Sequence, residues 1–593
     1  MQQTYSDNVL LYRQLVDKEG KRLFVLSMSR LVVFIVGLAL LFLLWGVSPV
    51  PALASFLVAV IIFIFLLKKY NRHEYSKTFY SKLLQVNENE LSGLNNRHDC
   101  FDGGNEFINP HHDFSHDTDL FGDDSLFRYL NRTCTDKGKN ILAGWLMDPL
   151  SLSGKMYERQ EAVRELAGKL QWRQEFQAYG MMGKTGEDEI EDFNSWLDED
   201  PSYINNTAKT VISVLMPSLA LLTLALSIAG IIHYSFFIMA FLVNLFIISL
   251  RLREINKIHA QVTGMHSMLK NLRQLIVHFE EHSFNAVYIK EMQKALTDEE
   301  EKATPSIRKL SKIIQAFDYR LNMLMAAPLN GLLLWDIQCI RRLEKWKLGA
   351  SELLPGWFDN LGRVDAMCSL ANYARNNEGF CYPEISESSH YLSALSMGHP
   401  LIPLRARVTN DFKVGSGGEI IIITGANMAG KSTFLRTVAV NMVMAMAGAP
   451  VCADKFIFTP CKVFTSMRTN DSLSDKESYF YAELKRLRVL KERIQDGENI
   501  FFLLDEILKG TNSKDKSEGA RLFTERLVEY KATGMIATHD VQLGGLAENY
   551  RQIKNKCFEI EIEGDDVKFD YILREGMTTK MNAAILMKQM KII

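Results

Sequence analysis

Residues 425–433 have the residue types and spacing of a phosphate-binding loop. They read Gly-Ala-Asn-Met-Ala-Gly-Lys-Ser-Thr and lie between an apolar run, 420–423, and a helical pattern, 434–447. Glycines let backbone N–H groups turn towards phosphates, and the start of the following helix adds a favourable dipole. We expect Lys431 to contact the β- and γ-phosphates of a nucleotide and Ser432 to bind Mg²⁺. The predicted phosphate-binding residues are Gly425, Ala426, Asn427, Met428, Ala429, Gly430, Lys431, Ser432 and Thr433.

Two further apolar runs end in side chains suited to phosphate chemistry. Residues 501–504 precede Asp505 and Glu506, and residues 535–538 precede His539. We expect Asp505 to hold Mg²⁺ and Glu506 to polarise the attacking water, as general base or as a water-orienting group. His539 alone would be better explained as a hydrogen-bonded loop histidine. In this order, however, the three strand ends predict a catalytic role for His539 and Mg-dependent hydrolysis of ATP to ADP and phosphate.

The elements that must position these residues form a predicted α/β unit. Short apolar runs at 419–424, 500–504 and 535–538 alternate with helical segments, which is typical of a parallel sheet. The fold class predicted for 398–593 is therefore an α/β P-loop ATPase domain. A mainly α-helical region is predicted to precede it.

Two long stretches without charge predict membrane hairpins. Residues 31–67 contain no charged side chain, and residues 210–250 contain only His233 as a titratable group. Because one bilayer crossing needs about 20 apolar residues, each stretch is long enough for two crossings. We predict helical hairpins at 31–47 with 52–67 and at 210–232 with 236–250. Buried core helices are the alternative explanation.

The charges beside these stretches predict their orientation. Lys and Arg residues flank both hairpins on their open sides, whereas the short tip loops contain none. By the positive-inside rule, both hairpins enter from the cytoplasm and return to it. This predicts a multi-pass protein of the inner membrane with its large soluble parts in the cytoplasm. The predicted segments are 1–30, hairpin 31–67, helical region 68–208, hairpin 209–250, helical region 251–397 and ATPase domain 398–593.

Composition narrows the remaining function classes. The chain has 593 residues and a net charge of -2, which argues against a surface that binds nucleic acid everywhere. Its 8 cysteines are scattered without a C-x-x-C pair, as in cytosolic proteins with reduced thiols. A loop at 95–119 contains His111, His112, Asp113, His116 and Asp117, for which we favour a solvated turn over a metal site.

These motifs together resemble the ATPase domain of the MutS family of DNA mismatch repair proteins, part of the ABC-type ATPases. The similar blocks are TGANMAGKSTFLRTVA at 424–439, DEILKGTNSKDKSEG at 505–519 and ATHD at 537–540. Weaker similarity to the MutS core begins at 119. It continues through 145–150, 159–163, the lead-in at 398–401 and 410–411, and the last strands at 569–576. The resemblance thus covers about 119–593, without the second hairpin.

The resemblance implies ATP and Mg²⁺ as ligands, and sites shared between the two subunits of a homodimer. In that family, a serine of one subunit reaches the γ-phosphate bound by the other. The matching position is Ser478, although Lys476 stands where the family has glycine. We therefore expect Ser478 to act in trans, and the alternative role for Ser478 is a helix N-cap.

Other departures from the family concern DNA. The mismatch-reading domain would lie before the core, where this chain has a membrane hairpin and no Phe-x-Glu tripeptide. The main hypothesis is a membrane-anchored MutS-like ATPase with DNA-binding activity related to mismatch repair. The alternative is an ATPase that remodels or signals at the inner membrane without DNA. A transporter is the least favoured class, because the predicted spans contain no charged side chain to line a path.

Overall fold

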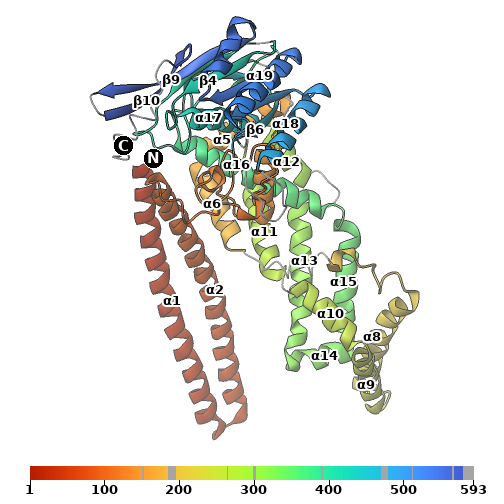
Figure 1. Ribbon diagram of the computed structural model, residues 1–593. Coiled ribbons are helices and arrows are strands. Elements are labelled where there is room, and N and C mark those ends of the chain that lie inside the picture. The colour runs from red at the N-terminus through yellow and green to blue at the C-terminus, as the bar shows by residue number, and fades with distance from the viewer. Residues whose placement is uncertain are drawn as a thin grey trace.

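The computed structural model describes residues 1–149, 153–183, 195–263, 265–297, 302–388, 391–415, 417–468, 479–509, 512–563 and 566–578. An α/β unit lies at one end of the molecule and a helical body lies below it (Figure 1). Two helical hairpins lie at the other end, away from the sheet.

The first hairpin consists of two continuous helices, α1 (Gln2–Trp45) and α2 (Pro49–Leu94), which pack side by side. Both are much longer than the expected spans 31–47 and 52–67, because their charged flanks contain no proline and continue the helix. Close packing is possible in the apolar part, where a Cβ added to Gly37 would lie 2.8 Å from the Cβ of Ala59. The apolar spans are therefore the far ends of two longer helices.

The helical body is built around α16 (Leu354–Asn376), most of whose side chains are buried. Asp365 of α16 accepts hydrogen bonds from the backbone N–H of Thr135 at 2.9 Å and from its hydroxyl at 2.6 Å. This contact fixes the start of α4 (Asp136–Met147), which packs on α16. The other elements of this part are η1 (Asn105–Phe107), α3 (Leu126–Leu130), α5 (Ser153–Gly168) and α6 (Leu170–Met181).

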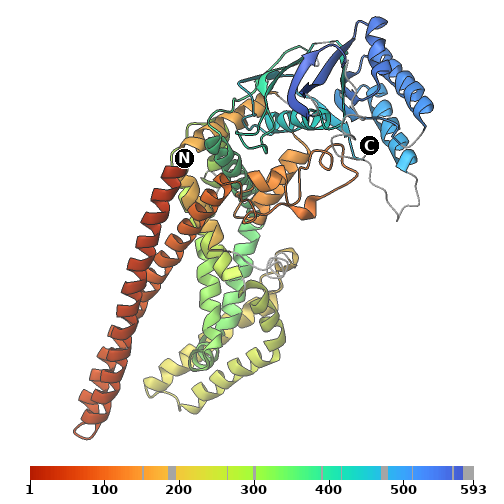
Figure 2. The same ribbon diagram turned by 60° about the vertical axis from the view of Figure 1, so that its left-hand side comes forward.

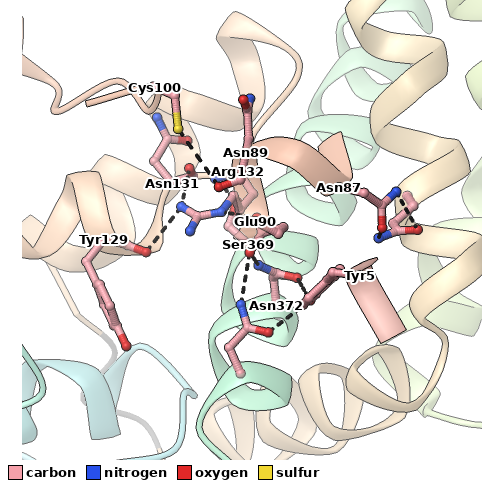
Figure 3. Close-up of polar contacts among 12 residues, drawn as sticks. Tyr5, Asn87, Asn89, Glu90, Cys100, Tyr129, Asn131, Arg132, Ser369 and Asn372 are labelled. Atoms are coloured by element: carbon pink, nitrogen blue, oxygen red, sulfur yellow. Dashed lines mark hydrogen bonds and ion pairs between the residues drawn. The ribbon is translucent and has the colours of Figure 1, made fainter. Parts of the chain in front are cut away.

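A buried polar network fastens the base of the first hairpin to α16 (Figure 3). From α1, the Tyr5 hydroxyl donates to Oδ1 of Asn376 at 2.9 Å. From α2, Glu90 forms an ion pair with Arg132 and accepts a hydrogen bond from Asn372 at 2.9 Å. Because these side chains are buried, each depends on its partner to offset the loss of water. The hairpin is therefore held rigidly against the helical body.

The second hairpin is formed by α8 (Thr207–Ile228) and α9 (Ser235–Leu250). Helix α8 ends four residues before the predicted end at 232, and a bend of 66° separates α9 from the next helix.

A series of helices follows the second hairpin. Thr304 and Pro305 lie in the first turn of one of them, α13 (Ala303–Phe317), where proline is tolerated. The helices that follow are α10 (Leu252–Thr263), α11 (Met265–Glu280), α12 (Val287–Thr297), α13 (Ala303–Phe317), η2 (Asp318–Leu321), α14 (Met323–Leu333) and α15 (Trp335–Ala350).

Helices α1, α2 and α8 of the described part are long and apolar enough to cross a membrane, and the bent pair α9–α10 raises the number to four. Their apolar windows are mostly exposed, and Phe42 near the tip of the first hairpin is 87% exposed. Both views place the apolar ends of the two hairpins at the end of the molecule opposite the sheet (Figures 1 and 2).

The α/β unit is centred on a six-stranded sheet with the strand order β10-β9-β4-β8-β7-β6. All neighbours are parallel except β10 and β9. Thr424 pairs with Thr538, and Asp505 pairs with Ala537, so β4, β7 and β8 end at one edge. The strands are β4 (Ile420–Gly425), β6 (Lys462–Ser466), β7 (Ile500–Asp505), β8 (Thr533–Thr538), β9 (Ile553–Glu563) and β10 (Asp566–Glu575).

The central strands β4, β7 and β8 are buried at every position, because helices cover both faces of the sheet. Ile421 and Ile423 belong to the core that contains α17 (Lys431–Met446), and Ile420 and Ile422 belong to the core of the opposite face. A smaller sheet has the order β1-β5-β2-β3. The remaining elements are β1 (Glu384–Ile385), β2 (Leu392–Met397), β3 (Asn410–Val414), β5 (Lys455–Phe458), α18 (Tyr479–Gln495), α19 (Ser513–Glu529), α20 (Val541–Gly544) and η3 (Gly545–Glu548). The observed fold is thus a mixed α/β unit joined to a mainly helical region, as predicted at this level.

The loop expected to be a solvated turn at 95–119 is partly buried against the α/β unit. Asp117 is 3% exposed, and its carboxylate accepts a hydrogen bond from the Thr465 hydroxyl at 2.6 Å. The backbone N–H of Thr465 donates to the carbonyl oxygen of Asp113 at 2.9 Å. Strand β6 lies at the edge of the sheet, and this loop satisfies hydrogen-bonding groups that the edge leaves unpaired.

Candidate functional site

The loop between β4 and α17 encloses the side chain of its own lysine. Gly430 has a φ of +106°, and a Cβ added there would lie 3.1 Å from Cδ1 of Tyr571, so this position favours glycine. Lys431 is 4% exposed, and its Nζ donates to the carbonyl oxygens of Gly425 at 2.8 Å and Ala426 at 3.0 Å. The lysine therefore lies at the floor of the loop, beside the backbone N–H groups at the start of α17.

Ser432 and Asp505 meet at the carboxyl edge of the sheet. The Ser432 hydroxyl donates to Oδ2 of Asp505 at 2.5 Å. Asp505 is 8% exposed, and its buried Oδ1 has no hydrogen-bond partner among the described residues. An unpaired buried carboxylate oxygen is costly, and hydroxyl and carboxylate oxygens are the kind of ligand that Mg²⁺ prefers. The pair therefore fits a Mg²⁺ site that phosphate and water oxygens would complete.

Glu506 is turned towards the loop by an unusual backbone conformation. Its φ is +50°, and its N–H donates to the carbonyl oxygen of Ala537 at 2.8 Å. Its Oε1 lies 3.3 Å from Nδ1 of His539 and 4.0 Å from Nζ of Lys431. A left-handed conformation is strained for a residue with a side chain, and such strain is concentrated at functional sites. The predicted site residues Lys431, Glu506 and His539 thus converge from the ends of β4, β7 and β8.

Burial and charge act in opposite directions on the ionisable groups of this site. Burial raises the pKa of the Glu506 carboxyl, but the positive charges of His539, Lys509 and Lys431 outweigh it and lower the pKa overall. Burial lowers the pKa of the Lys431 ammonium group, and the nearby Glu506 and Asp505 partly offset that effect. Glu506 is therefore a carboxylate at neutral pH and can accept a hydrogen bond from water.

A cavity of about 480 Å³ opens over the loop and is lined by both polar and apolar residues. This volume is typical of small-molecule sites. Such a cavity suits a phosphorylated ligand that also carries a flat apolar group. The polar lining includes His399, Asn410, Asn427, Gly430, Lys431, Ser432, Thr433, Thr437 and Glu506, and the apolar lining includes Ile402, Ala406, Val408, Met428, Phe434, Phe558 and Tyr571.

Tyr571 is a lining residue for which sequence analysis predicted no role. It has a φ of +56° and lies in an irregularity of the β9–β10 pairing between Phe569 and Leu573. Asn410 holds this irregularity in place, because its Nδ2 donates to the Tyr571 carbonyl at 3.0 Å and its Oδ1 accepts from the Leu573 N–H at 2.7 Å. Asn410 belongs to the lead-in segment, but no local pattern links it to a residue 161 positions away.

His399 is a second lining residue without a predicted role. Burial and the nearby Arg436 lower the pKa of its imidazole to about 4, so it is neutral at physiological pH. A neutral ring at this position adds no charge to the cavity wall. Its ring accepts a hydrogen bond from the nearby Leu401 N–H, but the charges of Arg436 and Asp119 come from distant segments that spacing alone does not reveal.

The other predicted residues occupy different positions around the cavity. His539 contacts Glu506 but does not line the cavity. Gly425, Ala426 and Ala429 form the loop without lining the cavity, and Ala429 is 2% exposed. The predicted trans residue Ser478 lies outside the described residues.

Comparison with known proteins locates this site within a family. Residues 421–590 match the family model described as MutS domain V. The DNA mismatch repair protein MutS of Thermotoga neapolitana is 26% identical over 297 residues, which cover 50% of this chain and 35% of that protein. MutS of Desulfatibacillum aliphaticivorans is 32% identical over 248 residues, covering 40% of this chain and 26% of the relative. Endonuclease MutS2 of Thermus thermophilus is 28% identical over 239 residues, covering 40% and 31%.

The matched part spans about a third of the length of these relatives. It contains Lys431, Ser432, Asp505 and Glu506, because all four lie inside the range matched by the family model. The part of the chain that holds this site is thus similar to domain V of MutS proteins.

Proposed function

We propose that this protein is a membrane-anchored, Mg-dependent ATPase that hydrolyses ATP to ADP and phosphate. The observation that carries the proposal is that Lys431, Ser432 and Glu506 line one cavity together with apolar side chains, while Asp505 is hydrogen-bonded to Ser432. A phosphate-binding loop alone supports nucleotide binding. Ser432 paired with the buried Asp505, and a neighbouring ionised glutamate, add what hydrolysis requires.

In the proposed mechanism, the N–H groups at the start of α17 bind the phosphates, and Lys431 exchanges the carbonyls of Gly425 and Ala426 for phosphate oxygens. Mg²⁺ held by Ser432 and Asp505 would supply positive charge to the phosphates. Glu506 accepts a hydrogen bond from the attacking water and orients it. His539 keeps the Glu506 carboxylate in place through the contact between Nδ1 and Oε1.

The proposed membrane anchors are the two hairpins, which attach the protein to the inner membrane with its soluble parts in the cytoplasm. The support comes from the length and exposed apolar surface of α1, α2 and α8. A soluble protein rarely exposes so much contiguous apolar surface. Lys18, Lys21, Lys68 and Lys69 lie on the side of the first hairpin nearest the helical body, as the positive-inside rule requires.

We further propose that two subunits share their ATP sites, with Ser478 of each subunit directed to the nucleotide of the other. Similarity to domain V of MutS proteins supports this arrangement. The exposed loop residue Met428, 77% exposed beside the cavity, lies on a surface that a second subunit would cover.

DNA is the proposed partner, with a role related to mismatch repair, because relatives named DNA mismatch repair protein and endonuclease share this domain. The second candidate is an ATPase that remodels or signals at the membrane without DNA. It is favoured by the net charge of -2 and by the hairpins.

ATP turnover by the full chain in lipid nanodiscs, with duplex, mismatched and branched DNA, separates the two. DNA-stimulated turnover that weakens between about 50 and 200 mM salt supports the first candidate, because salt weakens contacts between a protein and DNA phosphates. Glu506→Gln should abolish turnover with every DNA. Unchanged turnover and no DNA binding in the unmodified protein would reject the DNA role and favour the second candidate.

A further inference from the structure

Helix α14 packs against both helices of the second hairpin, although sequence analysis placed it within the helical region 251–397. Asn244, a fully buried amide in α9, donates to the carbonyl oxygen of Gly331 at 2.8 Å. A Cβ added to Gly331 would lie 2.2 Å from the ring of Phe241, so glycine permits this close approach. In an apolar environment the Asn244 amide needs such a partner. Helix α14 therefore completes the hairpin and shares its surroundings.

Large apolar side chains are exposed at the start of α14 and in the turn just before it. Leu324 is 86% exposed, Leu321 is 70% exposed and Met325 is 54% exposed. No charged residue lies between Arg320 and Asp336, and these two form an ion pair with each other at 3.1 Å. The 11-residue helix is about 16 Å long at the usual rise, roughly half of a bilayer core. It is too short to cross a membrane and has the length of a segment that inserts from one side.

Aromatic residues lie at both ends of this segment. Tyr319 precedes α14 and is 51% exposed, and Trp335 follows it as the first residue of α15. Tryptophan and tyrosine are enriched where a protein passes from hydrocarbon to headgroups. Their positions are consistent with a boundary at the junction of α14 with α13 and α15.

Next to this junction, α13 and α15 border a groove of about 490 Å³ with a cationic rim. Arg308, Lys309 and Lys312 come from α13 and Arg342 from α15, and none has an ion-pair partner within the described residues. Lys312 precedes the end of α13 by five residues, about 8 Å along the helix, which is comparable to the thickness of one headgroup layer. The apolar floor consists of Ile313 and Ala316, and Pro305 is an exposed apolar residue of the lining.

We propose that α14 is embedded in the bilayer beside the second hairpin and that the cationic groove binds the phosphates of anionic phospholipids. The proposal rests on the membrane anchoring proposed above. A bilayer is the occupant because the exposed surface of α14 continues that of α8 and α9, against which it packs. The charge of the rim complements anionic headgroups, and the apolar floor accommodates the glycerol end of the acyl chains.

The depth of α14 is measured with the full chain in liposomes that contain doxyl-labelled lipids. A fluorophore is attached to Leu324→Cys, to Phe42→Cys at the tip of the first hairpin, or to Leu522→Cys on α19. The exposed native Cys100 is replaced by serine in each variant. We expect lipid quenching at Leu324 and Phe42 and none at Leu522. Quenching at Phe42 alone would overturn the inference and leave the anchoring proposal intact. Quenching at neither would overturn both.

The groove is tested with the double variant Lys309→Glu/Lys312→Glu and a matched control, Lys290→Glu/Lys514→Glu, which alters exposed lysines elsewhere. The readout is retention of spin-labelled phosphatidylglycerol relative to phosphatidylcholine by the solubilised full chain. We expect the preference for phosphatidylglycerol to fall at least about tenfold in the first variant and to persist in the control. Equal losses in both variants would overturn the proposal.

Two competitors identify the source of the phosphate group in the same assay. Inorganic phosphate at millimolar concentration should not displace the lipid, because the apolar floor contributes to binding. Duplex DNA should not displace it either. Displacement by inorganic phosphate would show a free-anion site, and displacement by DNA would show a nucleic-acid surface. Either result would overturn the lipid assignment.

Discussion

At the scale of single residues, the backbone conformation of Glu506 decides what its side chain contacts. With a φ of +50°, the residue leaves the direction of β7 and brings its carboxylate to His539 and Lys431. Asp505, one position earlier, continues the strand and meets Ser432. Two adjacent carboxylates therefore have different environments, one suited to Mg²⁺ and the other to water.

Replacing His539 by alanine should shift the acid limb of the pH profile for ATP turnover to higher pH. The pKa of Glu506 is low because nearby positive charges outweigh burial. Among these charges, that of His539 lowers the pKa most. In the unmodified protein the ionised form should persist below pH 4.5, and it is lost as pH falls through the lowered pKa. Without His539, burial is opposed less, so protonation should begin at higher pH.

The measurement is kcat/KM as a function of pH, with the exposed loop variant His111→Ala as the control. An acid limb that is the same in His539→Ala and in the control would contradict the assigned role of His539.

Lys431→Met should weaken ATP binding by about 10- to 100-fold, the value of a hydrogen bond to a charged group, and abolish hydrolysis. Methionine is preferable to alanine because Lys431 is buried and fills the floor of the loop. Binding is measured by calorimetry, with Lys514→Met on α19 as control and thermal unfolding as the check on folding. Full turnover in a folded Lys431→Met protein would refute the loop assignment.

At the scale of elements, the site depends on parallel strands that end at the same level. The pairing of Thr424 with Thr538 and of Asp505 with Ala537 fixes that level. The base of the first hairpin is positioned differently, by side chains. Tyr5, Glu90 and Arg132 connect α1 and α2 to the helical body (Figure 3).

Arg132→Met should destabilise the folded protein by about 3–5 kcal/mol, because it leaves the buried Glu90 carboxylate without its cation. The matched control is Arg13→Met, whose partner Glu88 is exposed, with an expected cost below about 1 kcal/mol. The free energy of unfolding is measured in detergent with denaturant. Similar costs for the two variants would contradict the importance of the buried network.

At the scale of the whole molecule, both hairpins lie at the end opposite the sheet, so the proposed membrane anchors and the proposed nucleotide site are far apart (Figures 1 and 2). The helical body connects these two ends, and the buried polar network holds the base of the first hairpin against that body. With the hairpins inserted as proposed, the α/β unit would lie beyond the membrane surface, where a second subunit and a soluble partner would have access to it.

Cysteine labelling tests the orientation of the first hairpin. An impermeant reagent added outside intact cells should label Ser48→Cys at the tip and not Asn95→Cys at the end of α2. The reason is that the basic clusters flank the same side of both hairpins. Both variants carry Cys100→Ser, and lysed cells serve as the control in which both are labelled. External labelling of Asn95→Cys but not of Ser48→Cys would reverse the topology.

Glu506→Gln should trap a dimer in the presence of ATP. The substitution keeps the size of the side chain and the nearby Asp505, while hydrolysis should fall by at least about 10²-fold. Stalled ATP should then hold two detergent-solubilised subunits together, as measured by light scattering. Ser478→Arg should weaken that dimer and leave nucleotide binding to the monomer intact. A monomer with and without ATP would contradict the shared site.

What the sequence determined by itself was local. The phosphate-binding loop could be predicted because its residues are consecutive, and β4, β7 and β8 because each is a short apolar run that ends in a polar group. The apolar character of the hairpins also follows from composition alone. The length of α1 and α2 did not, because the charged flanks carry no signal that distinguishes a continued helix from a loop.

Only the tertiary structure decided which distant residues meet. Asn410 shapes the Tyr571 wall of the cavity across 161 positions, and Gly331 brings α14 against Asn244 of the second hairpin. Asp117 is buried because the edge strand β6 needs hydrogen-bond partners. Each contact depends on close packing between elements that spacing along the chain does not relate. Sequence therefore predicted the residues proposed to contact phosphate, while packing determined which residues surround them.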